Sequence, residues 1–393
     1  MRVLHVIPGL ALRTGGPAVA VVESALALRA LGAETAIVAT DLAAAASAAD
    51  GAGRVRRDEL PPGADQLDVT LVPARRPHRL AFAPRLPAVL RRRVAEADVV
   101  HVHSLFLFPQ LAAYRAARAA GVPYIVSPSG ALDPQLRGRS RVAKALAGAL
   151  WQDRMLQQAA ALHFKTDDEA ALTADLGLRA PAIVVPNGIR WEAFQGAASG
   201  RAFRERYLAG SDAPLVLNHG RLSHKKNLDV LVRGFAAARA RVPDAQLVLA
   251  GPDDEGLRPA LEALAREADI ADATRFVGLL ARDELLPALA AADAWALPSR
   301  TENFATAAVE ALAAGAAVVL SPAVNIAADV EREGAGVVCA AEPDALGREL
   351  ASLLLDADRR ACLSARARAF ARRFDWSHVA PRWLQMYEGT AAA

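Results

Sequence analysis

Short apolar runs alternate with longer segments rich in Ala, Leu and Arg along most of the chain. Fully apolar strands separated by helices are typical of parallel sheets that helices cover on both faces. The runs fall into two series, and two such series predict an α/β protein with two doubly wound domains. The first series reads VLHVI, TAIVAT, VTLVPA, DVVHVHS, PYIVSPS, ALHFKT and AIVVP, and the second reads PLVLNHG, QLVLAG, TRFVG, AWALPS, AAVVLSP and GVVCA.

The boundary between the domains is predicted at residues 186–188. Their Pro-Asn-Gly sequence favours a turn and ends the apolar run before it. A chain of 393 residues also exceeds the size at which a single core usually splits, about 250–300 residues. We therefore expect one domain over 1–187 and a second over 188–375. The remaining segment, 376–393, carries aromatic residues at helical spacing and predicts a packed terminal helix.

No run in the sequence predicts a membrane span or a secretory signal. The longest uncharged stretch, residues 311–328, contains Gly315 and Pro322 and reads as a helix end, a turn and a buried strand. Cys339 and Cys362 show no metal or disulfide spacing. A soluble cytoplasmic protein is the expectation.

Charge is unevenly distributed, with a net +6 over residues 1–187 and −3 over the remainder. The densest basic stretches are Arg75–Arg93 and Arg137–Arg154, which also contain Phe, Leu and Trp. Such stretches either rest on an anionic membrane surface or form ordinary solvated helix faces. No stacking aromatic or groove-reading motif accompanies the charge, so nucleic acid is not an expected partner.

Ligands of open parallel sheets bind at the carboxyl ends of strands, beside helix N-termini that favour anions. One such end carries Gly15 and Gly16 before Pro17, and two glycines let the backbone approach a ligand closely. The pair departs from GxGxxG, and a simple turn is the alternative.

A second strand end runs into Gly220 and Arg221, followed by Lys225 and Lys226 at the start of a helix. Cations are disfavoured by the helix dipole at this position, so their presence indicates a shared anion such as a phosphate. The alternative is a solvated charge cluster.

A third strand end leads to Glu302 in a loop and Glu310 inside the following helix. The first amides of that helix, around residues 303–306, are free to bind phosphate. Carboxylates accept hydrogen bonds from vicinal hydroxyls, and a Glu in an otherwise apolar helix needs a partner.

A fourth strand end carries His101 and His103, which share a face because strand side chains repeat every two residues. A metal site needs a third ligand that the sequence does not reveal, so none is predicted. His103 is either an active-site residue or a satisfied core histidine.

These motifs resemble the GT4-type retaining glycosyltransferases of the GT-B fold over nearly the whole chain. The most specific element is the E-x7-E spacing of Glu302 and Glu310 within PSRTENFATAAVEALAAGAAVV. GRLSHKKNLD resembles the family's phosphate-binding segment, with Arg221 and Lys226 at the matching positions. Weaker matches follow in the expected order: GGP, PNGI, AGPDD and RFVGLL.

The resemblance implies a donor site on the second domain and an acceptor site on the first. Glu310 would bind the ribose, Glu302 the sugar hydroxyls, and Arg221 with Lys226 the diphosphate. The remaining donor-binding positions implied are the amides of Asn303, Phe304 and Ala305, the base-holding backbone of Val277, Gly278 and Leu279, and the cleft-lining Gly15 and Gly16. The terminal helix would cross back to the first domain.

The implied reaction moves a hexose from a UDP- or GDP-linked donor to a hydroxyl of a glycan or lipid-linked saccharide, as in cell-envelope or exopolysaccharide synthesis. The leaving diphosphate would deprotonate the acceptor on the front face, so the configuration is retained. No protein nucleophile, metal or cofactor is then required.

Two departures from the family pattern affect these expectations. Pro128 and Ser129 occupy a turn where many relatives place a histidine, so that role is vacant or taken by Ser129 or His103. The usual Glu-Gly-Phe-Gly is here Glu302–Ala305, which changes the sugar pocket but not its amide donors.

Three alternatives remain open at the level of sequence. The first is another nucleotide-sugar enzyme, such as an epimerase, or a phosphorylase, although no pyridoxal-phosphate lysine environment is evident. The second is a non-catalytic GT-B partner subunit. The third is a dinucleotide oxidoreductase, which the missing glycine fingerprint disfavours.

Overall fold

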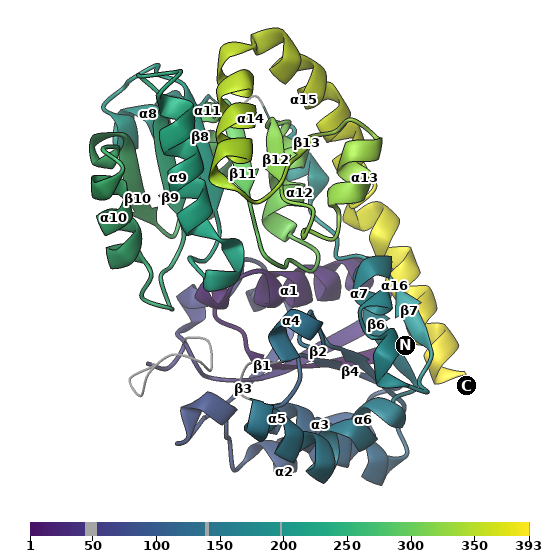
Figure 1. Ribbon diagram of the computed structural model, residues 1–393. Coiled ribbons are helices and arrows are strands. Elements are labelled where there is room, and N and C mark those ends of the chain that lie inside the picture. The colour runs from purple at the N-terminus through teal and green to yellow at the C-terminus, as the bar shows by residue number, and fades with distance from the viewer. Residues whose placement is uncertain (44–52, 138–140, 197–198, 393) are drawn as a thin grey trace. The chain divides into compact units, whose positions relative to one another are not determined.

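A computed structural model describes residues 1–43, 53–137, 141–196 and 199–392. The chain forms two compact units, Met1–Gly188 together with Trp376–Ala393 (unit 1), and Ile189–Asp375 (unit 2) (Figure 1). Within the described ranges, no helix is long and apolar enough to cross a bilayer.

Unit 1 contains a parallel sheet of seven strands in the order β3-β2-β1-β4-β5-β6-β7. The strand order reverses between β1 and β4, which makes the carboxyl ends of these two strands the topological switch point. The strands are β1 (Arg2–Gly9), β2 (Glu34–Thr40), β3 (Asp68–Val72), β4 (Val99–His103), β5 (Tyr124–Ser127), β6 (Ala161–Phe164) and β7 (Ala182–Val184).

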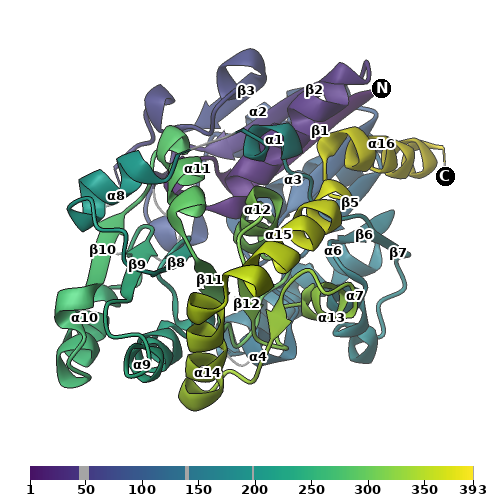
Figure 2. The ribbon, with the colours of Figure 1, turned by 90° about the horizontal axis from the view of Figure 1, so that it is seen from above.

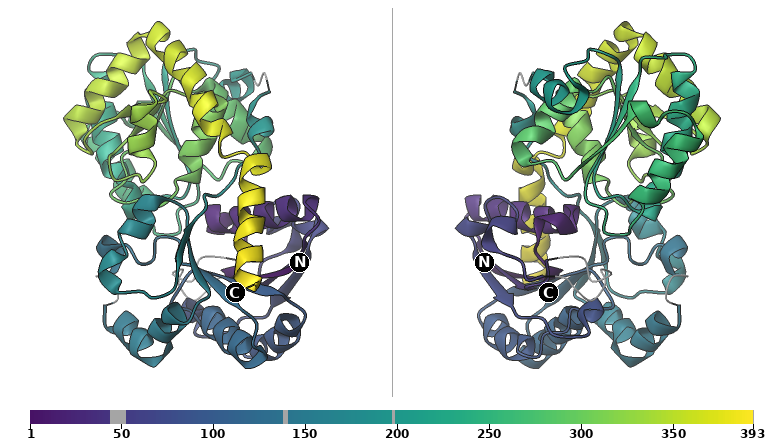
Figure 3. Two further views of the ribbon diagram at one scale, coloured as in Figure 1. Left: turned by 90° about the vertical axis from the view of Figure 1, so that its right-hand side faces the viewer. Right: turned by 90° about the vertical axis from the view of Figure 1, so that its left-hand side faces the viewer.

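Helices bury both faces of this sheet, as its nearly uninterrupted apolar strands require. Apolar side chains of α2 (Leu86–Ala95), α3 (Phe108–Ala120) and α6 (Asp153–Gln157) cover one face. On the other face lie α1 (Gly16–Ala30) and α16 (Trp376–Ala391), side by side (Figure 3). The shorter helices of unit 1 are α4 (Pro134–Arg137), α5 (Arg141–Ala147) and α7 (Asp167–Ala171).

Two tryptophans of the terminal helix α16 bury their rings in unit 1 and donate hydrogen bonds through their indole N–H groups. The Trp383 indole donates to the carbonyl of Pro186 at 2.8 Å, and the Trp376 indole donates to Glu23 at 3.2 Å. Both rings are buried, so each satisfied N–H avoids a desolvation cost of about 1–3 kcal/mol.

Unit 2 contains a parallel sheet of six strands in the order β10-β9-β8-β11-β12-β13. Its switch point lies between β8 and β11. The strands are β8 (Leu215–His219), β9 (Gln246–Ala250), β10 (Thr274–Gly278), β11 (Ala294–Leu297), β12 (Val318–Leu320) and β13 (Val337–Val338).

Two groups of helices cover the faces of the unit 2 sheet. On one face α9 (Leu228–Arg239) packs against α14 (Pro343–Leu355), with α10 (Arg258–Glu267) beside α9 (Figure 2). A Cβ at position 347 would lie only 2.8 Å from the carbonyl oxygen of Gly234, so glycine sets the close approach of α9 and α14. The other face carries α8 (Arg201–Leu208), α11 (Arg282–Ala291), α12 (Thr306–Ala314) and α15 (Ala357–Arg372), and α13 (Ala327–Arg332) lies beside β13.

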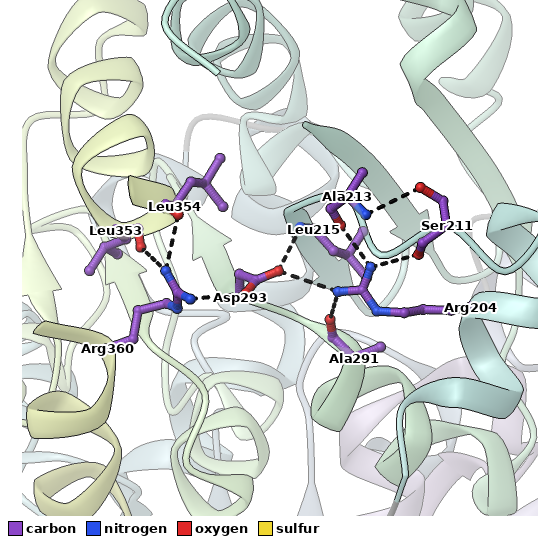
Figure 4. A network of polar contacts seen from close by, with 9 residues as sticks. All are labelled: Arg204, Ser211, Ala213, Leu215, Ala291, Asp293, Leu353, Leu354 and Arg360. Atoms are coloured by element: carbon purple, nitrogen blue, oxygen red, sulfur yellow. Dashed lines mark hydrogen bonds and ion pairs between the residues drawn. The ribbon is translucent and has the colours of Figure 1, made fainter. Parts of the chain in front are cut away.

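A polar network around Asp293 ties the amino ends of β8 and β11 to two helices (Figure 4). The Asp293 carboxylate accepts from the Leu215 amide at 2.9 Å and from Arg204 of α8 at 3.3 Å, and it pairs with Arg360 of α15. Both guanidinium groups also donate to helix and loop carbonyls. The network therefore lies at the amino ends of the strands, whereas ligands of such sheets bind at the carboxyl ends.

The fold class expected from the sequence is confirmed. Each of the apolar runs named above contains a strand, seven in unit 1 and six in unit 2. Residues 311–328 run from the end of α12 through a turn and β12 to the start of α13, and thus contain the expected helix end, turn and buried strand.

Candidate functional site

The carboxyl ends of β8 and β11, at the switch point of unit 2, bring together four of the predicted donor-site residues, Arg221, Lys226, Glu302 and Glu310. The loop after β8 is close-packed, since a Cβ at Gly251 would lie 2.0 Å from the carbonyl oxygen of Gly220. Gly220 itself has φ +116°, a conformation that favours glycine. Arg221 and a 3-10 turn, His224–Lys226, follow directly.

Lys226 is the buried cation of this site, with 5% of its surface exposed. Its ammonium donates to the carbonyl of His219 at 3.3 Å and lies against Gly220, where a Cβ would come within 2.5 Å of Nζ. Burial lowers the pKa of Lys226 to about 8, while Glu302 and Glu310 oppose the shift and Lys225 and Arg221 add to it. All these groups therefore lie within electrostatic reach of one ammonium.

Glu302 lies in the loop before α12 and pairs with Lys225 at 2.6 Å. Burial alone would raise the pKa of this carboxyl, but Lys225, Lys226 and Arg221 outweigh it and lower the pKa. The carboxylate is therefore ionised at neutral pH and able to accept hydrogen bonds.

Glu310 lies inside α12, and its Oε2 is 3.0 Å from Nε2 of His219, the last residue of β8. The Trp295 indole of β11 donates to Nδ1 of the same imidazole at 2.8 Å. The polar partner expected for a carboxylate in an apolar helix is thus a histidine.

The N-terminus of α12 presents backbone donors at the same strand ends. Ala305 precedes the helix in a left-handed conformation (φ 53°), and within the described residues no side chain caps it. Three polar atoms in the loops that follow β8 and β11, Ser223 Oγ, Ser299 Oγ and Asn303 Oδ1, are buried without a hydrogen-bond partner in the described part of the chain. Buried polar groups are seldom left unsatisfied, so these atoms are candidates to bind water or a polar ligand.

The predicted base-holding backbone comprises Val277 and Gly278, the last two residues of β10, and Leu279, which follows the strand. Val277 borders a pocket of about 570 Å³ together with Arg258 and Phe276, whose guanidinium and ring are in cation–π contact. Gly278 adopts φ 72°, and Leu279 is half exposed. The role in base binding stays a prediction.

The remaining predicted residues lie in unit 1. Gly15 precedes α1 with φ 87°, and Gly16 and Pro17 open that helix. Ser129 follows β5, is exposed and has φ 52°. The adjacent amide of Gly130 donates to the buried carboxylate of Glu169 at 2.7 Å. His103 ends β4 and is buried.

His103 belongs to a buried cluster of imidazoles. His5 of β1 lies opposite His101 of β4, and its Nδ1 is 3.0 Å from Nε2 of His103. His101 Nδ1 lies 2.7 Å from the hydroxyl of Tyr387, and His101 Nε2 lies 3.3 Å from His163 Nδ1. Burial lowers the pKa of all four histidines, that of His5 to about 3.

His5, His101 and His103 each offer one ligand atom within 4.8 Å of the others, so they could hold a metal ion. Hydrogen bonds nevertheless account for both nitrogens of His101. The ammonium of Lys165 also lies 3.0 Å from His163 and would repel a cation, although burial lowers its pKa to about 7 against the effect of Glu169. We therefore interpret the cluster as a hydrogen-bonded core that joins β1, β4 and β6 to α16.

The sequence indicated the charged residues of the candidate site, but not the ring side chains that contact Glu310 and His103. It did not identify His219, Trp295 or His5, because each acquires its role only when neighbouring strands are placed. One signal was available for His219, an imidazole at the last position of a strand directly before Gly220 and Arg221.

Comparison with known proteins identifies the family. The model of the glycosyl transferases group 1 matches residues 200–370, and the model of the glycosyl transferase 4-like domain matches residues 15–188. The chain belongs to this GT4-type family of glycosyltransferases. It is 31% identical to a D-inositol 3-phosphate glycosyltransferase of Stackebrandtia nassauensis over 76% of this chain and 70% of that protein. The match to the protein of that name from Kineococcus radiotolerans, 32% identical, covers 60% of this chain but only 58% of its relative.

The fold is that of GT-B glycosyltransferases. Anabaena HepE, solved in complex with UDP and glucose, superposes with a TM-score of 0.79 at 18% identity, over 99% of this chain and 100% of that one. At this identity the likeness concerns the fold alone.

Proposed function

We propose that the protein is a retaining hexosyltransferase that uses a UDP- or GDP-linked sugar and a hydroxyl acceptor on a glycan or lipid-linked saccharide, in the assembly of cell-envelope or extracellular polysaccharide. The proposal of a nucleotide-sugar donor rests on one observation. Buried polar atoms without a partner in the described residues lie beside cationic side chains and the uncapped N-terminus of α12. A diphosphate carrying hydroxyl-rich groups satisfies all three at once. HepE, solved in complex with UDP and glucose, supports this choice of donor.

In the proposed reaction the acceptor oxygen bonds to the anomeric carbon as that carbon's bond to the diphosphate oxygen breaks. Both events occur on one face of the sugar, and the acceptor proton passes to the departing diphosphate. Arg221 and Lys226 would stabilise the charge that grows on the leaving group. No step requires a metal, a cofactor or a covalent intermediate with the protein.

The donor half is tested by thermal unfolding with UDP, GDP, ADP and TDP. A nucleotide at 100 times its dissociation constant should raise the free energy of unfolding by about 2.7 kcal/mol. Glu310→Ala should weaken this response because the ribose contact is lost, whereas Glu302→Ala should preserve it because UDP and GDP carry no sugar at that position. If no nucleotide raises the unfolding temperature of the wild-type protein, the proposed donor is wrong.

Turnover separates an enzyme from a partner subunit. Glu302→Ala should lower sugar transfer by about 100-fold or more, while Glu267→Ala, on an exposed position of α10, should not change it. Nucleotide binding without transfer by the wild type would favour the non-catalytic subunit, and interconversion of donor sugars without an acceptor would favour an epimerase.

We also propose that the basic stretches of unit 1 contact an anionic membrane. Leu146 and Leu150, in or beside α5, are 61% and 67% exposed within the second basic stretch, where an apolar side chain gains by entering a bilayer interface. The protein should co-sediment with phosphatidylglycerol vesicles but not with phosphatidylcholine vesicles. Replacing both leucines by serine should weaken this binding about tenfold, and equal binding to both vesicles would contradict the proposal.

A further inference from the structure

The carboxylate of Glu310 is held by a chain of two ring side chains that the motif does not include. Glu310 Oε2 lies 3.0 Å from Nε2 of His219, and Nδ1 of His219 lies 2.8 Å from the indole nitrogen of Trp295. Trp295 is fully buried and His219 is buried, so the chain is enclosed up to the carboxylate.

The chain has a single consistent assignment of protons. An indole nitrogen can only donate, so Nδ1 of His219 must accept and carries no proton. The neutral imidazole then carries its proton on Nε2, which donates it to Glu310 Oε2. Trp295 therefore fixes both the ring orientation and the tautomer that the carboxylate requires.

The positions of the three residues explain why they meet. Trp295 lies opposite Leu217 in the β8–β11 pair, and the imidazole two residues further along β8 projects over the same face. The helix that carries Glu310 follows β11. The carbonyl of His219 also accepts from Lys226, so one residue contacts both the carboxylate and the buried cation.

We propose that His219 is a positioning residue, which aims the carboxylate of Glu310 at the ribose hydroxyls of the donor with Trp295 fixing its tautomer. This inference rests on the proposed function, in which Glu310 binds the ribose. A free glutamate side chain loses rotamer freedom when it is ordered, and this loss opposes binding. A bond to His219 restricts that freedom before the ligand arrives.

The experiment compares His219→Leu, His219→Gln and Trp295→Phe. Glutamine can still donate an N–H toward Glu310 and should rescue binding, whereas leucine cannot. Trp295→Phe removes one N–H and keeps a ring, so His219 becomes free to take the other tautomer. His378→Leu, on an exposed position of α16, is the matched control.

The ligand is the nucleoside diphosphate that stabilises the wild type most, and its 2′,3′-dideoxy form is the comparison. Calorimetry measures the dissociation constant of each. His219→Leu should weaken the ribose form about tenfold and the dideoxy form less than twofold. Trp295→Phe should follow in the same direction, and His219→Gln and His378→Leu should stay within about threefold of wild type. In turnover, the effect should fall on the donor KM rather than on kcat.

Equal weakening of both nucleotides by His219→Leu, or no weakening of either, would overturn the inference. If that variant does not fold, Trp295→Phe decides by the same comparison. Failure of the wild type to bind any nucleoside diphosphate is a different result, because it removes the proposed function itself.

Discussion

At the scale of single residues, the candidate site is organised around a buried lysine, Lys226. Lys226 keeps its charge near neutral pH because two carboxylates oppose the effect of burial, and its pKa is lowered only to about 8. A bound diphosphate would supply two further negative charges beside it. Proton uptake and donor binding should therefore be linked at this residue.

Donor affinity should fall as the pH rises through about 8. Below that pH Lys226 is charged in the free protein, and above it each pH unit should weaken binding by up to about tenfold, until the higher pKa of the bound state is passed. The dissociation constant of the nucleoside diphosphate, measured from pH 6.5 to 9.5, reports this slope. Lys226→Arg keeps its charge and should bind with little change over the range. A flat wild-type profile would show that Lys226 does not face the diphosphate.

The principal residues of the candidate site could be predicted because their types and spacing are local. Glu302 and Glu310 share one loop and helix, and Arg221 and Lys226 share another, so a single stretch of chain displays each pair. His219 and Trp295 could not be predicted, because their contact depends on β8 and β11 being neighbours. The sequence shows two strands, but not their order in the sheet.

At the scale of elements, the same limit applies to the imidazole cluster of unit 1. The two-residue period of a strand correctly places His101 and His103 on one face. It gives no indication that β1 brings His5 beside them or that α16 covers them with Tyr387. The strands themselves were predictable because each is an apolar run bounded by turn residues.

Unit 1 should lose stability in mild acid. Burial, with a contribution from Lys165, lowers the pKa of His5 from 6.5 to about 3, so below pH 6.5 the unfolded chain takes up a proton that the folded chain refuses. The contribution is complete above pH 6.5 and falls by about 1.4 kcal/mol for each pH unit below it, with the other three histidines acting in the same direction.

Urea unfolding followed by tryptophan fluorescence at pH 7.5, 6.5, 5.5 and 4.5 measures this slope. His5→Asn should make the dependence shallower, because asparagine has no proton to take up in this range. His378→Asn, which alters an exposed histidine, should leave it unchanged. An identical slope in His5→Asn and wild type would show that the cluster does not titrate as buried neutral imidazoles.

At the scale of the whole molecule, the two series of strands correspond to two units, but only unit 2 is one continuous segment. The chain leaves unit 1 at Gly188 and returns to it at Trp376. Gly188 lies against the Trp376 ring, since a Cβ there would be 2.3 Å from it, and the Ile189 amide donates to the carbonyl of Phe374 at 2.8 Å within unit 2. The two segments that connect the units therefore start close together in unit 1 and end close together in unit 2.

Because α16 follows unit 2 in the chain, unit 1 is completed after unit 2 during synthesis on the ribosome. All of unit 2 has been translated while unit 1 still lacks the helix that covers Val3, Val99 and Ile125. Until α16 is translated, the part of that apolar face that α1 does not cover has no intramolecular cover. A chain cut short by a stop codon before α16 would expose that face to chaperones and proteases although unit 2 is complete.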